Sequence, residues 1–436
     1  MASRFSYGCP AFQRPFPMTD YSILSLAKNA LNGQAGWSRA WRKPDPKPAY
    51  DVVIVGGGGH GLATAHYLAK HHGITNVAVL EKNLIGSGNV GRNTTLVRSN
   101  YMLDRTLPFY EHSLKLWEGL SHDLNYNVMF SSRGIINLAH SPGQLDVFRR
   151  RANSMLLNGV KAEILSTDQI AEKVPALDVS NAARFPILGG LYQARGGTAR
   201  HDAVAWGFAR SADRRGVDII EQCEVTGFLK KDGRVVGVST SRGEIRAKKT
   251  AIVVAGSSSH VLQQAGLNNL PIESHVLQAF VSEGLKPVLD VAITFGAGHL
   301  YVSQSDKGGL VFGGDLDGYN SYAQRGNLPI AEDVATMLLA MFPAFAKVRM
   351  LRSWGGVMDM SMDGQPIIDI GPVPGLYINC GWCYEGFKAT PASGYTFAWT
   401  IANDAPHELN APFTLSRFQT GYVLDEKGRG PFPGHH

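Results

Sequence analysis

The sequence is poor in cysteine, lacks long apolar runs and carries no strong excess of either charge. Four cysteines in 436 residues are too few for a disulfide-stabilised scaffold, which indicates a reducing compartment. No stretch approaches the roughly 18 uninterrupted apolar residues of a membrane span. The first residues also lack the cationic start, apolar core and small-residue cleavage site of a secretion signal. These absences predict a cytoplasmic protein without a membrane span.

The positive excess is small and dispersed. The formal net charge is +6, and Lys and Arg cluster only in two short runs, Arg149–Arg151 and Lys248–Lys249. Runs of this length are predicted to lie on solvated faces, so nucleic-acid binding is not expected. An anionic substrate or cofactor is the better use of the charge. With 44% apolar residues, the chain can bury a large core and is expected to form two lobes.

A glycine-rich turn between a strand and a helix organises the rest of the chain. Asp51–Val55 is a β-branched apolar run of the kind found in buried parallel strands. Gly56, Gly58 and Gly61 then form a G-x-G-x-x-G motif, and Leu62–Lys70 has helical spacing. The first glycine allows a tight turn, the second lets a pyrophosphate approach the backbone, and the third allows close helix–strand packing.

The context of this motif predicts a dinucleotide site. Val77–Leu80 is a second apolar run, and it ends in Glu81, where a carboxylate can accept hydrogen bonds from ribose hydroxyls. The loop 86–95 that follows is rich in small, amide and hydroxyl residues suited to a cofactor's phosphates and ring edge. Arg98 lies just behind this loop, and a bidentate clamp for a substrate carboxylate is favoured over a surface cation.

The remaining pattern predicts an α/β fold typical of two-dinucleotide-domain flavoproteins: a Rossmann-like, two-dinucleotide-binding FAD domain with an antiparallel-sheet substrate domain. Helices are expected at residues 22–31, 109–120, 144–157, 203–210 and 331–341. Strands are expected at residues 217–220, 223–228, 234–240, 251–256 and 376–381. The predicted organisation is an N-terminal arm (1–49), a discontinuous FAD-binding domain (50–125, 190–272 and 352–425) and a substrate domain (126–189 and 273–351). The arm is expected to pack on a neighbouring surface or subunit, and residues 1–18 could equally be a disordered leader.

Several other residues allow two interpretations. Lys388 and the helix start around Gly386 would lie at a flavin ring, where negative charge develops on reduction. Cys380 and Cys383 suggest a metal or a redox dithiol, but zinc needs four ligands and no second pair exists, so no metal site is predicted. From chemistry alone, His201 is more simply a capping or hydrogen-bonded histidine. The same-face pair His299 and Tyr301 is likewise more simply structural.

Taken together, these motifs resemble the β subunits of heterotetrameric sarcosine oxidases, in the glycine/D-amino-acid oxidase family. The resemblance covers about residues 20–425, and it is carried by residues 55–82, 92–95, 98–101, 200–202 and 386–388. It implies noncovalent FAD and, at the interface with a larger α subunit, FMN joined to a histidine. His201 matches the flavin-linked histidine by its place in the motif, which reverses the interpretation from chemistry alone.

The resemblance also assigns roles to individual residues. Arg98 and Lys388 resemble the pair that holds the substrate carboxylate. The FMN side is implied at Arg200, His201, His299 and Arg352. The FAD side, with the glycine motif and the loop after it, is implied at Gly56, Gly58, Gly59, His60, Gly61, Glu81, Asn89, Val90, Arg92, Asn93, Thr94, Val225, Tyr384, Gly386 and Lys388.

The implied activity is oxidative demethylation of sarcosine, with electrons passing from FAD to FMN and then to oxygen. The implied partners are the α, γ and δ subunits, with NAD and tetrahydrofolate on the α subunit. Two alternatives stay open: the corresponding subunit of an N-methylglutamate or other N-methyl amino acid dehydrogenase, and a flavin electron-relay subunit without its own substrate. Glu385 departs from the family pattern, which has glycine there; its carboxylate could repel that of sarcosine or pair with a basic group on another substrate.

Overall fold

The computed structural model describes residues 23–35, 39–180, 182–296 and 300–426. The chain divides into two compact units, residues 1–40 and 41–436, which are described separately. In the first unit, helix α1 (Ile23–Leu31) confirms the helix expected at residues 22–31, and none of its residues is buried. The proposals for residues 1–18 lie outside the described residues, and packing of the arm on a neighbour stays a prediction.

The second unit contains a largely parallel sheet built around β1 (Ala49–Val55). Strand β1 pairs on both edges, with β2 (Val77–Leu80) and β11 (Gly243–Ile252), both parallel, and its residues Val52–Val55 are buried because both faces of the strand lie in apolar clusters. The parallel pairing continues to β8 beyond β2 and to β18 beyond β11, while β17 pairs antiparallel with β18. Strands β9 and β10 form a hairpin, and β10 pairs antiparallel with β11. These outer strands are β8 (Asp218–Ile220), β9 (Val225–Lys231), β10 (Arg234–Thr240), β17 (Ile367–Ile370) and β18 (Leu376–Cys380).

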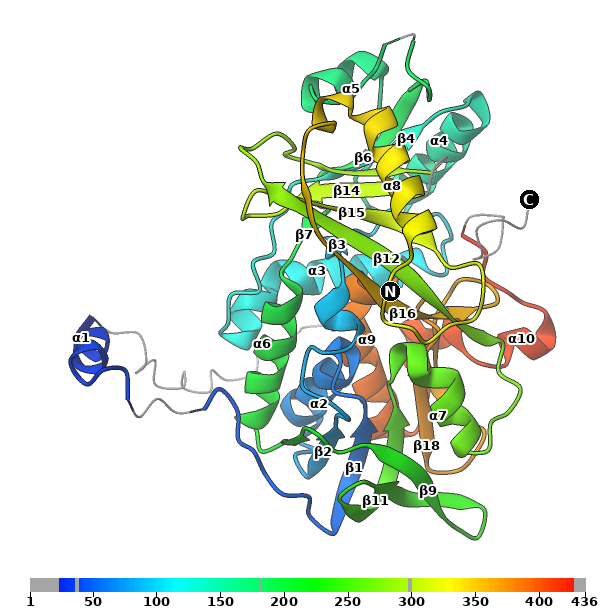
Figure 1. Cartoon of the computed structure of the whole chain (residues 1–436). Coiled ribbons are helices and arrows are strands. Elements are labelled where there is room, and N and C mark those ends of the chain that lie inside the picture. Colours follow the sequence, from blue (N-terminus) through cyan, green and yellow to red (C-terminus); the bar gives the residue numbers. More distant parts are fainter. Residues whose placement is uncertain (1–22, 36–38, 181, 297–299, 427–436) are drawn as a thin grey trace, which may run out of the picture. The chain divides into compact units, whose positions relative to one another are not determined.

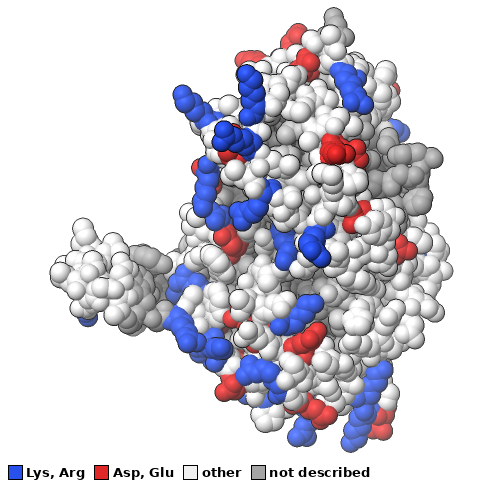
Figure 2. Space-filling model, viewed as in Figure 1, with Lys and Arg blue, Asp and Glu red and all other residues white. Residues whose placement is uncertain are grey.

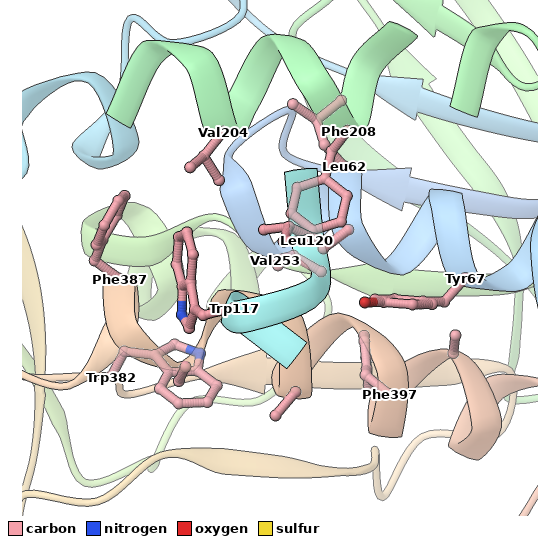
Figure 3. Packing of buried hydrophobic residues seen from close by; sticks show 14 of the residues in the cluster. Leu62, Tyr67, Trp117, Leu120, Val204, Phe208, Val253, Trp382, Phe387 and Phe397 are labelled. Carbon is pink, nitrogen blue, oxygen red and sulfur yellow. The ribbon is translucent and has the colours of Figure 1, made fainter. Parts of the chain in front are cut away.

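Helices pack beside this sheet in a continuous apolar core. Helix α2 (Gly59–His72) contacts both α6 (His201–Asp213) and α9 (Gly386–Asn403), and α3 (Leu107–Leu124) contacts α9 (Figure 1). Figure 3 shows the apolar side chains that meet here, among them Leu62 of α2, Phe208 of α6 and Phe397 of α9, all fully buried. Because α2 has neighbours on several sides, Gly59 and residues 61–69 are all buried.

A second sheet, almost wholly antiparallel, joins two distant parts of the chain. Its order is β16-β12-β15-β14-β13-β4-β6-β5, and only the pair β13–β4 is parallel. The strands are β4 (Ile135–Ala139), β5 (Glu163–Leu165), β6 (Gly189–Gln193), β12 (Ile272–Gly284), β13 (Ala292–Phe295), β14 (Leu300–Gln304), β15 (Gly309–Leu316) and β16 (Met350–Ser361). Helices in contact with it include α4 (Pro142–Leu157), α5 (Thr167–Lys173) and α8 (Leu328–Met341) (Figure 1).

The two sheets confirm the predicted fold class, a dinucleotide-binding sheet combined with an antiparallel sheet. The predicted domain boundaries stay a prediction; the one between residues 351 and 352 falls within β16. The remaining elements are the strands β3 (Leu96–Val97) and β7 (Gly197–Thr198), the helices α7 (Ser258–Gln264) and α10 (Arg417–Thr420), and the 3-10 helices η1 (Asn89–Arg92), η2 (Ala255–Ser257), η3 (Pro343–Phe345) and η4 (Glu408–Phe413).

The strand expected at residues 251–256 ends earlier than predicted. It stops at Ile252, and Gly256 lies in η2. A Cβ atom on Gly256 would lie 2.2 Å from the backbone oxygen of Val357. The glycine is therefore required by the close approach of β16, which the pattern of a single strand cannot reveal.

The surface agrees with the dispersed charge of the sequence. Figure 2 shows Lys and Arg spread over one face with Asp and Glu between them. Within the described ranges, no helix combines the length and the apolar character needed to cross a bilayer.

Candidate functional site

At two positions of the glycine motif between β1 and α2, no residue larger than glycine fits. Gly56 has φ of 111°, and a Cβ there would lie 2.1 Å from the backbone oxygen of Val253. A Cβ on Gly61 would lie 2.0 Å from the backbone oxygen of Gly56. The first and third glycines of the motif therefore serve the tight turn and the close packing of helix on strand, as predicted.

Gly58 differs, because its added Cβ would meet no protein atom within 4 Å. Its backbone is extended and caps the N-terminus of α2, so the first amide groups of the helix face this open space. Beside it, the Glu81 carboxylate accepts hydrogen bonds from the backbone N–H of Gly57 (3.0 Å) and of Asn83 (2.9 Å). A helix N-terminus, open space and a fixed carboxylate together fit the phosphates and ribose of a dinucleotide.

A cavity of about 870 Å³ opens from this turn. Its volume lies in the upper part of the usual range for small-molecule sites, roughly 300–1,000 Å³. The predicted FAD residues that line it are Gly56, Gly58, Gly59, His60, Glu81, Asn89, Val90, Arg92, Asn93, Thr94, Val225, Tyr384, Gly386 and Lys388. Gly61 packs beneath the turn. The cavity continues to the second sheet, where Thr294 and Tyr301 line it.

At the start of α9, Glu385 joins the two residues predicted to clamp a substrate carboxylate. Its Oε2 lies 2.6 Å from Lys388 Nζ and 3.3 Å from Arg98 Nη2, and the Tyr101 hydroxyl also donates to it. Burial raises the pKa of Glu385, but Lys388 and Arg98 lower it by more. The pKa of this carboxyl therefore lies well below its usual range. Arg98 and Lys388 are thus brought together, with a protein carboxylate between them.

Aromatic and amide groups hold Arg98 in place. Its Nη1 donates to Asn100 Oδ1 (2.7 Å), and its guanidinium lies 4.9 Å from the centroid of the Tyr101 ring. Tyr101 in turn stacks on Tyr110 at 3.6 Å. The sequence left two possibilities for Glu385, repulsion of a substrate carboxylate or pairing with a basic group on the substrate. The structure shows a third arrangement, an ion pair with the protein's own cations.

His60, inside the glycine motif, is held neutral. One ring nitrogen contacts Ser393 Oγ (2.6 Å) and the other the backbone oxygen of Gly386 (2.9 Å), so the ring links α2 to the start of α9. Burial lowers the pKa of His60 to about 4, although the Gly386 carbonyl raises it in part. The ring therefore carries no charge at neutral pH.

We expect His60 to contribute to acid sensitivity. Its folded pKa lies below the unfolded value of about 6.5, so its contribution to stability is complete above pH 6.5 and is lost as the pH falls towards 4. Between pH 7 and pH 5 this loss is roughly 2 kcal/mol. His60→Gln should reduce the pH dependence by about that amount, measured by urea unfolding at both pH values. An unchanged difference between the two pH values would contradict this origin.

His201 begins α6, next to the cavity wall. Its Nδ1 is buried, lies 4.0 Å from Asp202 Oδ1 and has no hydrogen-bond partner among the described residues. Burial lowers the pKa of His201, Asp202 raises it and Arg200 lowers it again, with a net decrease. Helix α6 contacts η1, whose residues line the cavity. His201 thus has a neutral imidazole nitrogen on a helix that contacts part of the cavity wall. This nitrogen makes no hydrogen bond to a described residue, so the structure does not support the capping role considered from the sequence.

The other residues predicted on the FMN side are only partly defined. Arg200 pairs with Asp202 through two hydrogen bonds of 2.9 and 3.1 Å. Arg352 is exposed on β16. His299 lies outside the described residues. Of the described residues that line the cavity, none is Arg200, His201 or Arg352, so any site they form lies beyond its wall.

The two cysteines of the C-x-x-C motif are buried free thiols. Burial raises the pKa of Cys383 to about 12 and that of Cys380 well above its usual value. A protonated thiol is a poor nucleophile, which argues against a redox dithiol. Across the part of the chain that the structure describes, no group of three or more His, Cys, Asp or Glu side chains is arranged to hold a metal ion.

Arg151 is one of the cavity residues that the sequence interpretation missed. The run Arg149–Arg151 was expected to be solvated, which is right for Arg149 and Arg150 and wrong for Arg151, because Arg151 lines the cavity. The available signal was helical spacing, since Phe148 and Arg151 lie three residues apart and share one helix face. The sequence interpretation treated the run as one block of charge and so did not separate Arg151 from its neighbours.

Known proteins resemble this chain in sequence and in fold. Residues 51–399 match the model of the family described as FAD dependent oxidoreductase. The chain is 65% identical to "Sarcosine oxidase subunit beta" of Rhizobium meliloti (strain 1021), over 95% of this chain and 100% of the relative. It is 52% identical to the protein of the same name from Arthrobacter sp, over 89% and 96%. Among solved structures, L-proline dehydrogenase from P. horikoshii aligns with a TM-score of 0.82 at 25% identity, covering 87% of this chain and 100% of that one.

Proposed function

The chain belongs to the FAD-dependent oxidoreductase family, and we propose that it is the catalytic β subunit of a heterotetrameric sarcosine oxidase. The observation that carries the proposal is the common cavity, which has the glycine turn in one wall and the Arg98–Lys388 pair in another. The relatives named as sarcosine oxidase β subunits, similar over nearly the whole chain, support it. When bound, FAD supplies a two-electron acceptor for oxidation of the N-methyl carbon of sarcosine.

The chain's own residues would bind and orient the reactants. The helix N-terminus behind Gly58 would hold the pyrophosphate, and Glu81 the ribose. Arg98 and Lys388 would fix the substrate carboxylate, and such positioning of a small substrate accounts for much of the rate enhancement of enzymes. Lys388, in the first turn of α9, would also add positive charge beside the space for the flavin ring.

A second flavin forms part of the proposal. FMN would be bound covalently at His201, with Arg200, His299 and Arg352 around it, and would pass electrons on to oxygen. Two observations support this position: the neutral Nδ1 of His201 has no hydrogen-bond partner among the described residues, and α6 contacts η1. The enzyme would assemble in the cytoplasm with α, γ and δ subunits, and the α subunit would carry NAD and tetrahydrofolate.

One observation favours a second candidate substrate. Because Glu385 cancels one of the two positive charges at Arg98 and Lys388, the site differs from a simple clamp for sarcosine. An N-methylglutamate or other N-methyl amino acid dehydrogenase of the same fold is the alternative.

The test is anaerobic stopped-flow absorbance of the purified complex mixed in turn with sarcosine, N-methylglutamate and dimethylglycine. Fast flavin bleaching by sarcosine is the expected result. Bleaching only by a bulkier N-methyl amino acid would leave the fold and cofactors in place and move the enzyme to the dehydrogenase alternative. If none of the three bleaches the flavin, the proposed substrate class is wrong and an electron-relay role replaces it.

A further inference from the structure

Arg151 of helix α4 lines the cavity. Its Nε is buried and has no hydrogen-bond partner in the described ranges, and no described carboxylate lies within salt-bridge distance. The guanidinium lies 5.8 Å from the centroid of the Phe148 ring, which also lines the cavity. A partly buried cation without a partner is costly, and a bound anion would offset that cost.

Arg98 and Lys388 already bind one anion, the carboxylate of Glu385. Glu385 accepts from both cations and from Tyr101, in the arrangement that a substrate carboxylate would otherwise adopt. The pair and Glu385 together carry one net positive charge instead of two. A substrate carboxylate therefore meets a weaker attraction here than in a site that has glycine at position 385.

The surroundings of Arg151 leave its charge available. Burial lowers the pKa of Arg151, and the nearby Arg98 lowers it as well, while Glu426 raises it. Glu426 is itself bound by the backbone N–H groups of Met102 and Leu103 and by the Thr106 hydroxyl. Glu426 thus attracts Arg151 from a distance but forms no ion pair with it within the described part of the chain.

On these grounds we propose that Arg151 binds the substrate carboxylate as a third cation and restores the positive charge that Glu385 cancels. The inference rests on the proposed function, because it names a specificity-determining residue of the same site. It places the substrate's negative charge between Arg98, Lys388 and Arg151 instead of at the first two alone. Glu385 and Arg151 are then linked by charge balance.

The experiment is an equilibrium titration of the full flavin-loaded complex with acetate at fixed ionic strength, followed by the absorbance of the oxidised flavin. Arg151→Gln should weaken acetate binding about 30-fold, within the range expected for hydrogen bonds to a charged group. Arg150→Gln, the same change at the exposed neighbouring position, should leave the Kd within about 2-fold of wild type. The KM of the N-methyl amino acid substrate should follow the same order.

The charge-balance claim is tested by a double variant. Glu385→Gln should tighten acetate binding about 10-fold, and Glu385→Gln with Arg151→Gln should return it to within about 3-fold of wild type. Arg151→Lys, which keeps the charge and loses the planar fork, should give an intermediate Kd and covers the case in which Arg151→Gln does not fold. Unchanged acetate binding in Arg151→Gln and Arg151→Lys would overturn the proposal and leave Arg151 as a counter-charge to Glu426.

The experiments distinguish failure of the proposed function from failure of the inference about Arg151. If no N-methyl amino acid reduces the flavin of the wild-type complex, the proposed function is wrong, whereas the acetate titration still reports on Arg151. If the substrate reduces the flavin normally and acetate binding ignores Arg151, only the inference about Arg151 fails.

Discussion

Replacing Gly58 by alanine is expected to give a folded protein that no longer binds FAD. The added methyl group meets no protein atom within 4 Å, and φ of −77° suits alanine, so the free energy of unfolding of the apoprotein should be unchanged or about 0.4–1 kcal/mol higher. The same methyl group would lie where the pyrophosphate approaches the backbone. FAD affinity should fall at least about 100-fold, or about 2.8 kcal/mol.

Gly61→Ala should fail for a different reason. Its methyl group would collide with the backbone oxygen of Gly56 at 2.0 Å, so β1 and α2 must separate. The apoprotein should lose about 3 kcal/mol or more of stability, the upper part of the range for overpacking, and FAD binding should be lost with it.

The two glycine variants are distinguished by measuring urea unfolding of the apoprotein together with FAD affinity. Gly119→Ala, on the exposed side of α3 and with no atom within 4 Å of the added Cβ, is the matched control and should keep both properties. If Gly58→Ala binds FAD normally, the phosphate position assigned to the turn is wrong.

His201→Asn is expected to abolish covalent flavin attachment completely. Asparagine has no imidazole nitrogen to form the bond, and the site offers His201 Nδ1 without a hydrogen-bond partner in the described residues. After acid precipitation of the complex, the wild-type chain should retain flavin in the pellet, and the variant should retain none. Noncovalent FAD released into the supernatant should be equal in both, because His201 does not line the cavity that the glycine turn opens.

The control for covalent attachment is His122→Asn, an exposed histidine of α3. It should behave as wild type. Flavin retained in the pellet of the His201 variant would place the covalent link elsewhere, and no pellet flavin in the wild-type complex would remove covalent FMN from the proposed function.

Local sequence patterns predicted most of the fold that positions the site. Strand β1 and helix α2 lie where the apolar run and the helical spacing place them, because both patterns depend on neighbours a few residues apart. Helix α8 begins at Leu328, three residues before its predicted start, because Asn327 caps it. Strand ends were predicted less exactly. The strand expected at residues 251–256 stops at Ile252, because pairing partners and packing decide where a strand ends.

The candidate site was predicted best where one short segment contains all its parts. The glycine turn and Glu81 are such a case, because β1, the turn, α2 and β2 form one continuous unit whose geometry is fixed by the missing side chains of Gly56 and Gly61. The sequence by itself thus determined the cofactor class and the turn that forms one wall of the cavity.

Only the tertiary structure decided how the charges of the site are paired. Arg98 and Glu385 are separated by 287 residues, and the sequence could not show that their side chains meet. Arg151 faces the cavity because α4 packs on the second sheet with its Phe148 side inward, while Arg150, one residue earlier, points to solvent. Charge pairing depends on distances between elements that fold together from distant parts of the chain, whereas a glycine motif depends on the space around a single turn.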